Sequence, residues 1–349
     1  MSSHAIFDRL GSRLGISRRA FALMASAAAL GGAARAQNLP LAMGPGKANV
    51  VTADIPGVTA AGSPLVFLKG GMTSSEGVVA APDGGVYFTE PSVSRVYKVD
   101  PDDQITVLFD PHHPDDPAGE RWRLPALAVD DKGVVYACRR ANTQIGIAIV
   151  YPADKMKFIA TAYRGVPFNA PNDLALAKNG GVYFTDPGSP DQGAERPHHI
   201  YYVNPSGAVI VGTDNLGRPN GLVLSRDEKI LYAVDSTSEF VFAFDVLADG
   251  ALGNRREFGR LKGIVKNDKG MTNGIDGMTI DNDGRVYAIS MAGIEVFAPN
   301  GDNLGVIPVP VKAQNLAFGG KDGRTLYIVG HGNLYRVSTL ARKYVGRAK

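Results

Sequence analysis

Six residues of this chain stand at a constant distance before a recurring tyrosine. Eleven or twelve residues before each of these tyrosines lie Glu76, Pro125, Asn172, Asn220, Asp276 and Asn315. Five of the six have a side-chain carboxylate or amide oxygen, and two carboxylates with neutral amides suit one hard divalent cation such as calcium. The alternative is that each residue only forms a turn at a strand entry, where Asn and Asp are common.

The tyrosines themselves mark a repeat. Each lies in a short apolar strand, and these strands are centred on Tyr87, Tyr136, Tyr183, Tyr232, Tyr287 and Tyr327. A turn sequence such as Asp83-Gly84 or Asp283-Gly284 precedes each strand, and Asx-Gly between alternating apolar residues is a strong hairpin signal. Further alternating strands follow, for example 95–99 and 104–109.

Six units of about four strands each predict an all-β fold, a six-bladed β-propeller. Residues 63–68 precede the first unit and are expected to supply the missing outer strand of the last blade. We therefore divide the chain into an export signal (1–36), a lead-in segment without clear pattern (37–61) and the propeller domain (62–349). A pair of β-sandwiches is the competing fold, but six equally spaced units argue against it.

In a propeller the equivalent ends of the innermost strands converge on the axis, so the oxygen-bearing residues should share one small volume. A second set of residues follows each tyrosine by three positions and includes Glu90, Asp186 and Asp235. Because neighbouring strands are antiparallel, these carboxylates should approach the same face. We expect them either to orient the ligands from behind or help bind substrate, or merely to cap the next turn.

Several other chemistries are excluded by the sequence. It has no G-x-S-x-G elbow, no Walker A loop and no dinucleotide fingerprint. The single cysteine, Cys138, excludes a disulfide framework and a zinc site of several cysteines. The arginines before residue 37 account for the whole formal charge of +3, and the remainder is slightly acidic, so we expect no nucleic-acid partner.

The first 36 residues are typical of a twin-arginine export signal. Ser17-Arg18-Arg19 opens an alanine-rich apolar run, and Ala34-Arg35-Ala36 provides small residues for cleavage near Ala36. An amphipathic helix or membrane anchor is the alternative, but the run is shorter than the roughly 20 residues that span a bilayer. We expect recognition by the twin-arginine machinery, a periplasmic location and no membrane span in the mature protein.

The order of the motifs along the chain resembles a known family. The motifs are Glu76-Gly77-Val78, Asn169-Ala170-Pro171-Asn172-Asp173, Arg218-Pro219-Asn220-Gly221, Asp276-Gly277-Met278 and Asn315-Leu316-Ala317-Phe318-Gly319. Together they resemble the family of senescence marker protein, gluconolactonase and luciferin-regenerating enzyme over nearly all of residues 62–340. That family is a six-bladed propeller with one catalytic divalent metal on its axis.

The resemblance implies that Glu76, Asn172, Asn220 and Asp276 bind the metal. It implies calcium as the usual ion, with zinc, manganese or magnesium as alternatives, and Asp276 as the catalytic acid/base. It places Asn169 and Asn172 near the substrate. Three features depart from the pattern: Pro125 at the start of the second unit, Arg139-Arg140 in place of a histidine, and Ala170 in place of a substrate-contacting arginine.

These features predict a metal-dependent lactonase of the gluconolactonase type that hydrolyses a small lactone with an activated water. Two alternatives stay open. One is a phosphotriesterase resembling diisopropylfluorophosphatase, and the other is a non-catalytic calcium-binding propeller that presents its face to a partner.

The paired arginines make the export route testable. Replacing Arg18 and Arg19 with lysine should trap the protein in the cytoplasm, because the twin-arginine route reads that pair. The measurement is cell fractionation followed by immunoblotting, with the unchanged sequence as control. An unaltered periplasmic yield would contradict the assignment.

Overall fold

Tight hairpins connect short strands throughout the protein. The computed structural model describes residues 50–110, 121–188, 198–267 and 270–344, all of which belong to one compact unit, Pro45–Lys349. The export signal and the first part of the lead-in segment lie outside the described residues. At the predicted turns, Gly84 and Gly284 adopt φ values of +92° and +81°, a conformation that glycine reaches without steric cost. The carboxylates of Asp83 and Asp281 accept backbone N–H groups within the same turns.

The strands form six four-stranded antiparallel sheets. The first contains β2 (Glu76–Ala80), β3 (Val86–Glu90), β4 (Arg95–Val99) and β5 (Ile105–Phe109). The second contains β6 (Leu127–Val129), β7 (Val135–Arg140), β8 (Ile145–Tyr151) and β9 (Lys157–Ala160). The third contains β12 (Leu174–Leu176), β13 (Val182–Asp186), β14 (His199–Val203) and β15 (Val209–Thr213).

The remaining three sheets follow the same plan. The fourth contains β16 (Pro219–Leu224), β17 (Ile230–Asp235), β18 (Phe240–Val246) and β19 (Leu252–Arg260). The fifth contains β22 (Met278–Ile280), β23 (Val286–Ser290), β24 (Gly293–Phe297) and β25 (Asn303–Ile307). The sixth contains β26 (Asn315–Gly319), β27 (Thr325–Gly330), β28 (Asn333–Ser338) and β1 (Val66–Lys69). Two short ribbons, β10–β11 (Ala162–Tyr163, Val166–Pro167) and β20–β21 (Val265–Asn267, Gly270–Thr272), project from the connections.

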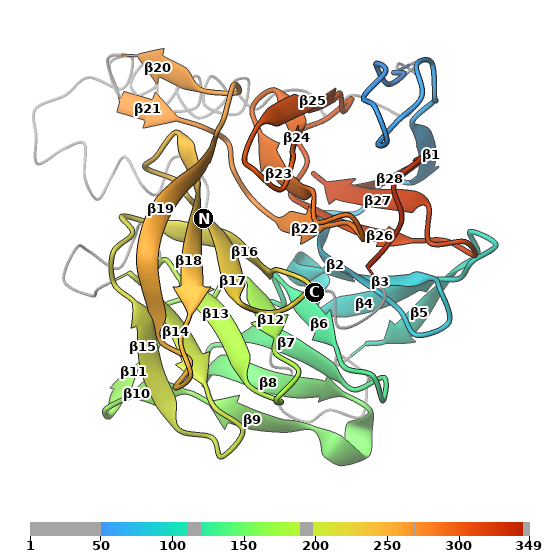
Figure 1. Ribbon diagram of the computed structural model, residues 1–349. Helices are drawn as coiled ribbons and strands as arrows, with labels where there is room; N and C mark the ends of the chain where they lie inside the picture. The colour runs from blue at the N-terminus through green and yellow to red at the C-terminus, as the bar shows by residue number, and fades with distance from the viewer. Residues whose placement is uncertain (1–49, 111–120, 189–197, 268–269, 345–349) are drawn as a thin grey trace, which may run out of the picture. The chain divides into compact units, whose positions relative to one another are not determined.

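The sheets are blades arranged around an axis. The inner strands contact one another in the closed order β2, β6, β12, β16, β22, β26 and back to β2, and they surround the centre of Figure 1. The six-bladed propeller predicted from the repeat is confirmed, and the two-sandwich alternative is wrong because no sandwich closes such a ring.

Among the described residues the only helices are two short 3-10 turns, at Pro91–Val93 and Ala153–Lys155, and no helix is long and apolar enough to cross a bilayer.

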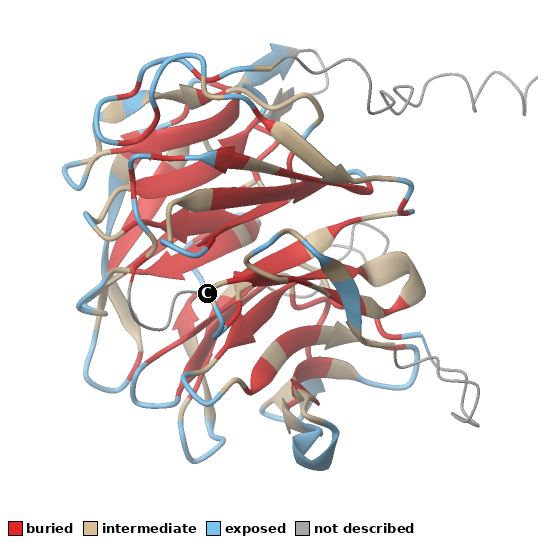
Figure 2. Ribbon diagram, turned by 90° about the vertical axis from the view of Figure 1, so that its right-hand side faces the viewer, coloured by how far each residue is buried: buried red, intermediate tan, exposed pale blue. Residues whose placement is uncertain are grey.

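One hydrophobic cluster fills each seam between neighbouring blades, including the seam between the last blade and the first. Figure 2 shows the strands largely buried and the exposed residues concentrated in the loops. The repeated tyrosines lie in these clusters. The hydroxyl groups of Tyr183 and Tyr287 donate to the Gly250 carbonyl and to Asp281 (both 2.9 Å), so the buried phenols are satisfied.

The ring is closed by a strand from the start of the described chain. β1 pairs antiparallel with β28, as expected for residues 63–68. The described end of the lead-in segment packs beside it: Ile55 and Val58 are fully buried in the cluster between the fifth and sixth blades, and the Val58 carbonyl accepts the Leu340 N–H (2.8 Å). Part of the segment without a sequence pattern therefore contributes to the core.

The closure predicts how truncations behave. Removing residues 1–49 should leave the propeller folded. Removing residues 1–61 should destabilise it, because Ile55 and Val58 each contribute about 1.5–3 kcal/mol by burial. Removing residues 1–69 should also expose the edge of β28 and cause aggregation. Denaturant unfolding and size-exclusion chromatography measure both effects, and a monomeric, cooperatively folding 70–349 fragment would contradict the closure.

Candidate functional site

The entries of the inner strands carry the predicted ligands. Glu76 is the first residue of β2 and Asn220 the second of β16, while Asn172 and Asp276 stand two residues before β12 and β22. Backbone hydrogen bonds fix them: the Asn172 N–H donates to the Thr185 carbonyl (2.8 Å). Because the inner strands form a closed ring, these entries meet at one end of the axis.

Glycines next to the ligands allow this close approach. β2 and β16 both have irregular registers at their entries, between Glu76 and Val79 and between Pro219 and Leu222. A Cβ atom on Gly221 would lie 2.3 Å from the Asp276 carbonyl oxygen, closer than any side chain tolerates. Gly77 has a φ of +55°. Such irregularities re-aim the adjacent side chains, here Glu76 and Asn220, toward the axis.

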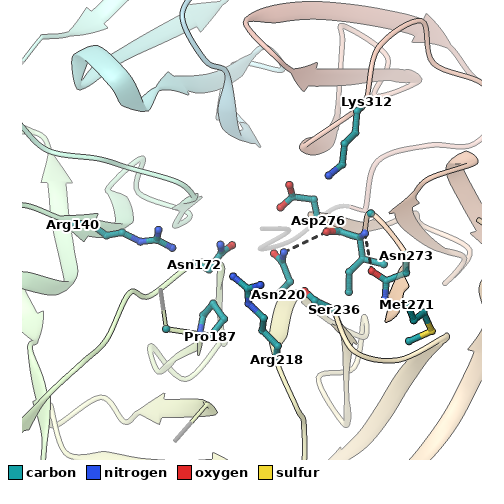
Figure 3. A pocket seen from close by; sticks show the side chains of 13 residues that line it. Arg140, Asn172, Pro187, Arg218, Asn220, Ser236, Met271, Asn273, Asp276 and Lys312 are labelled. Atoms are coloured by element: carbon teal, nitrogen blue, oxygen red, sulfur yellow. Dashed lines mark hydrogen bonds between the residues drawn. The ribbon is translucent and has the colours of Figure 1, made fainter. Parts of the chain in front are cut away.

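A polar cavity of about 440 Å³ opens over these entries. Its walls come from the second to the sixth blade and include Arg140, Asn172, Arg218, Asn220, Asp276 and Lys312. Figure 3 shows these side chains directed toward a common space, with Asn220 between Arg218 and Asp276. The volume is within the range of ligand-binding pockets, roughly 300–1,000 Å³.

Negative charge is concentrated around Glu76, which does not itself line the cavity. Burial raises the pKa of Glu76 well above its usual range, and the nearby carboxylates of Asp276 and Asp173 raise this pKa further. Arg140 and a hydrogen bond from Gln314 Nε2 to Glu76 Oε1 (2.6 Å) oppose the shift. Since neighbouring carboxylates raise each other's pKa by repulsion, a cation at this position would relieve that repulsion.

A buried oxygen without a hydrogen-bond partner also favours a bound cation. Asn220 Nδ2 donates to the Ile275 carbonyl (3.4 Å). This hydrogen bond fixes the orientation of the amide and so identifies its other atom as the oxygen, Oδ1. Asn220 Oδ1 is buried and has no hydrogen-bond partner within the described chain. A buried polar atom left unpaired costs about 1–3 kcal/mol. A bound cation would satisfy it.

The donor set therefore fits a divalent cation. The described residues contain no cluster of three or more His, Cys, Asp or Glu with metal-binding geometry, so a metal here would use two carboxylates together with amide oxygens. Glu76, Asp276, Asn172 and Asn220 provide these oxygens. Oxygen ligands with room for additional waters are what calcium accepts.

The second set of carboxylates binds backbone instead of facing the cavity. Asp186 accepts the N–H groups of Asn169 and Ala170 (2.8 and 2.6 Å), and Asp235 accepts those of Gly217 and Arg218 (2.6 and 3.0 Å). Burial raises the pKa of Asp186, while these backbone hydrogen bonds lower it. Each carboxylate thus holds the loop that leads into Asn172 or Asn220. Their predicted influence on the ligands would act through these loops.

Gln314 and Asp173 connect neighbouring blades beneath the site. The Gln314 side chain donates to Glu76 and accepts the His331 N–H (2.7 Å), and its backbone carbonyl accepts the Gly277 N–H (2.9 Å). The Asp173 carboxylate accepts the Leu222 N–H of β16 (3.0 Å). The two carboxylates Glu76 and Asp276, which lie in different blades, are therefore linked through Gln314.

Two oxygen-bearing residues of the register, Glu76 and Asn315, are not among the residues that line the cavity. Asn315 is buried against Gly277 and its Oδ1 accepts the Leu316 N–H (2.9 Å). Asn169 is also buried, and its backbone N–H is held by Asp186. The Asn315 side chain thus bonds to the adjacent backbone within β26. The substrate role of Asn169 stays a prediction.

Sequence reasoning missed the cations of the cavity wall. Arg139, which the tyrosine register selects, stacks on Trp122 with its guanidinium carbon 3.8 Å from the ring centre. Its neighbour Arg140 projects to the opposite face of β7, where it lines the cavity and donates to the carbonyls of Pro171 and Ala170 (2.8 and 3.0 Å). Arg218 and Lys312 stand two and three residues before Asn220 and Asn315.

Taken together, fold and site define a six-bladed propeller with an oxygen-lined axial centre under a polar cavity. Residues 74–332 match the family described as the SMP-30/Gluconolactonase/LRE-like region. The chain belongs to this family, which confirms the resemblance recognised in the sequence.

Individual relatives agree with this membership. The chain is 29% identical over 338 residues to a gluconolactonase from Zymomonas mobilis, covering 91% of this chain and 93% of that protein. It is similar in structure to a gluconolactonase from Xanthomonas campestris, with 27% identity, a TM-score of 0.67 and coverage of 83% of this chain and 97% of the other. A calcium-binding protein, regucalcin, from Agrobacterium tumefaciens shares the fold at 18% identity and a TM-score of 0.64, over 82% of this chain and 96% of that one.

Proposed function

We propose that this protein is a metal-dependent lactonase that opens a sugar-type lactone, as the names of its gluconolactonase relatives suggest. The observation that carries the proposal is the unpaired Asn220 oxygen in the lining of an open polar cavity, which Asp276 also lines. Family membership supports lactone hydrolysis as the reaction class. Calcium is the proposed ion because every proposed ligand atom is an oxygen.

The chemistry divides between the cation and the chain. When bound, a divalent cation would polarise the lactone carbonyl and make the attacking water more acidic. Glu76, Asn172, Asn220 and Asp276 would hold that cation. Gln314 would keep Glu76 in orientation by its hydrogen bond. The Asp276 carboxylate would remove the proton from the attacking water and return it to the leaving ring oxygen.

No covalent nucleophile is needed for this route. The one cysteine, Cys138, is fully buried in the seam between the second and third blades. Water attack directed by a carboxylate therefore accounts for hydrolysis with the residues present at the site. Export through the twin-arginine route, with cleavage near Ala36, completes the proposal and would make this a periplasmic lactonase.

Metal removal tests the proposed function. The purified protein should hydrolyse D-glucono-1,5-lactone faster than the buffer does, lose this activity after chelation, and regain it with calcium. The measurement is proton release in a pH-indicator assay, with zinc, manganese and magnesium in parallel. A protein that binds calcium but hydrolyses no lactone would favour the binding-platform alternative, and hydrolysis of phosphotriesters alone would favour the phosphotriesterase. Native protein fully occupied by zinc would contradict the choice of calcium.

The role of Asp276 has its own test. Asp276→Asn keeps the size and one oxygen donor but removes the proton-accepting charge, so kcat should fall by ~10²–10⁴-fold even at saturating calcium. Asp235→Asn is the matched comparison, because Asp235 acts through the Gly217–Arg218 backbone and such outer residues typically contribute about 10–100-fold. Circular dichroism checks folding. If saturating calcium restores the wild-type kcat to Asp276→Asn, this residue is only a ligand and the base must be another carboxylate.

A further inference from the structure

Cationic side chains outnumber carboxylates in the lining of the cavity. Three cationic side chains line it, Arg140, Arg218 and Lys312, against one lining carboxylate, Asp276. They come from three different blades: Arg140 ends β7, Arg218 precedes β16 and Lys312 precedes β26. A cavity that gathers cations from separate parts of the fold favours anionic ligands.

The charge of Arg140 is already matched. Its Nε and Nη2 atoms donate to the carbonyls of Pro171 and Ala170, and the carboxylates of Glu76 and Asp186 act on it electrostatically. Arg140 therefore holds the loop before Asn172 and offsets part of the charge of Glu76. It is a structural cation of the site.

Arg218 and Lys312 are different. Within the described part of the chain, neither side chain makes a hydrogen bond or an ion pair with any carboxylate, although Arg218 is half-buried. The backbone of Arg218 is held in place, since its N–H donates to Asp235 Oδ1 (3.0 Å). In Figure 3 its guanidinium group points toward Asn172 and Asn220, while the Lys312 ammonium group points toward Asp276 from the opposite side.

These two cations flank the proposed reaction centre. A lactone whose carbonyl lies over Asn220 and Asp276 would place its outer substituents near Arg218 or Lys312. A planar guanidinium group pairs with a carboxylate or phosphate through two parallel hydrogen bonds, which makes Arg218 the better partner for such a substituent. The cavity volume of about 440 Å³ accommodates a molecule of hexose size together with the substituent.

We infer that the site selects lactones that carry an anionic group outside the ring, held by Arg218 with Lys312 as the second cation. This inference rests on the proposed lactonase function and names its substrate class. For a carboxylate-bearing lactone, water adds to the ring carbonyl, the ring C–O bond breaks, and the product is a dicarboxylate with release of one proton. The substituent itself does not react.

A matched substrate pair tests the inference. D-glucaro-1,4-lactone and D-glucono-1,4-lactone share the same ring and differ only in a terminal carboxylate in place of a hydroxymethyl group. The calcium-loaded protein should prefer the carboxylate-bearing lactone in kcat/KM by at least about tenfold, since a charge-assisted hydrogen bond contributes about tenfold to hundredfold. 6-Phosphoglucono-1,5-lactone, compared with its unphosphorylated parent, shows whether phosphate is preferred instead.

Variants assign the preference to the cavity cations. Arg218→Met should lower the selectivity ratio by about tenfold to hundredfold, Arg218→Lys should retain part of it, and Lys312→Met should lower it less. Arg255→Met is the control: this arginine lies on the outer strand of the same blade and hydrogen bonds Asn215, so the ratio should not change. High salt should reduce the preference of the unchanged protein.

Two failures remain distinguishable. If the neutral lactone is hydrolysed as well as the charged one, and Arg218→Met leaves the ratio unchanged, the inference is wrong while the lactonase proposal stands. If no lactone is hydrolysed with any metal, the lactonase proposal is wrong. In that case, calorimetric titration with D-glucarate and D-gluconate tests whether the cavity prefers the anionic group in binding alone, because these acids differ by the same carboxylate. Equal affinity, or a preference unaffected by Arg218→Met, would overturn the inference.

Discussion

The close approach of six inner strands around one axis is the constraint on which the other features depend. The strands form a closed ring of contacts, and at its narrow entries a side chain on Gly221 would collide with the Asp276 backbone. Close packing of this kind brings Glu76, Asn220 and Asp276, which are far apart in sequence, to one end of the axis. β1, from the start of the described chain, completes the last blade as its outer strand.

Convergence alone would leave the ligands on unsupported loops. The loops are held by buried carboxylates of the next strand, Asp186 and Asp235, which accept the backbone N–H groups that precede Asn172 and Asn220. Gln314 adds a connection between Glu76 and the segment of Asp276. A site whose ligands are positioned from behind in this way is pre-organised, which reduces the cost of ordering it when a cation or substrate binds.

The charges of the site form two groups, carboxylates near the strand entries and cations on the walls of the cavity. Near the strand entries, burial and the carboxylates of Asp276 and Asp173 raise the pKa of Glu76, and Arg140 offsets this shift only in part. At the walls, Arg218 and Lys312 have no partner of their own among the described residues. A divalent cation would balance the carboxylates near the strand entries. An anionic substrate would balance the cations of the walls. The proposed function and the proposed substrate class thus follow from the same arrangement of charges.

The sequence by itself determined the repeat, the hairpin turns, the closing strand and the register that contains the four proposed ligands. These features are local: period-two alternation and Asx-Gly turns report the geometry of each strand and hairpin without reference to its neighbours. Tertiary structure decided which register positions reach the cavity. Asn315 turns back to its own backbone, and Arg140 rather than Arg139 faces the axis. The burial of Ile55 and Val58 could not be predicted from the sequence either, because it depends on the seam between two blades. The contacts of Arg218, Lys312 and Gln314 depend on how adjacent blades pack, and no periodicity within one blade encodes the distance to a side chain in another.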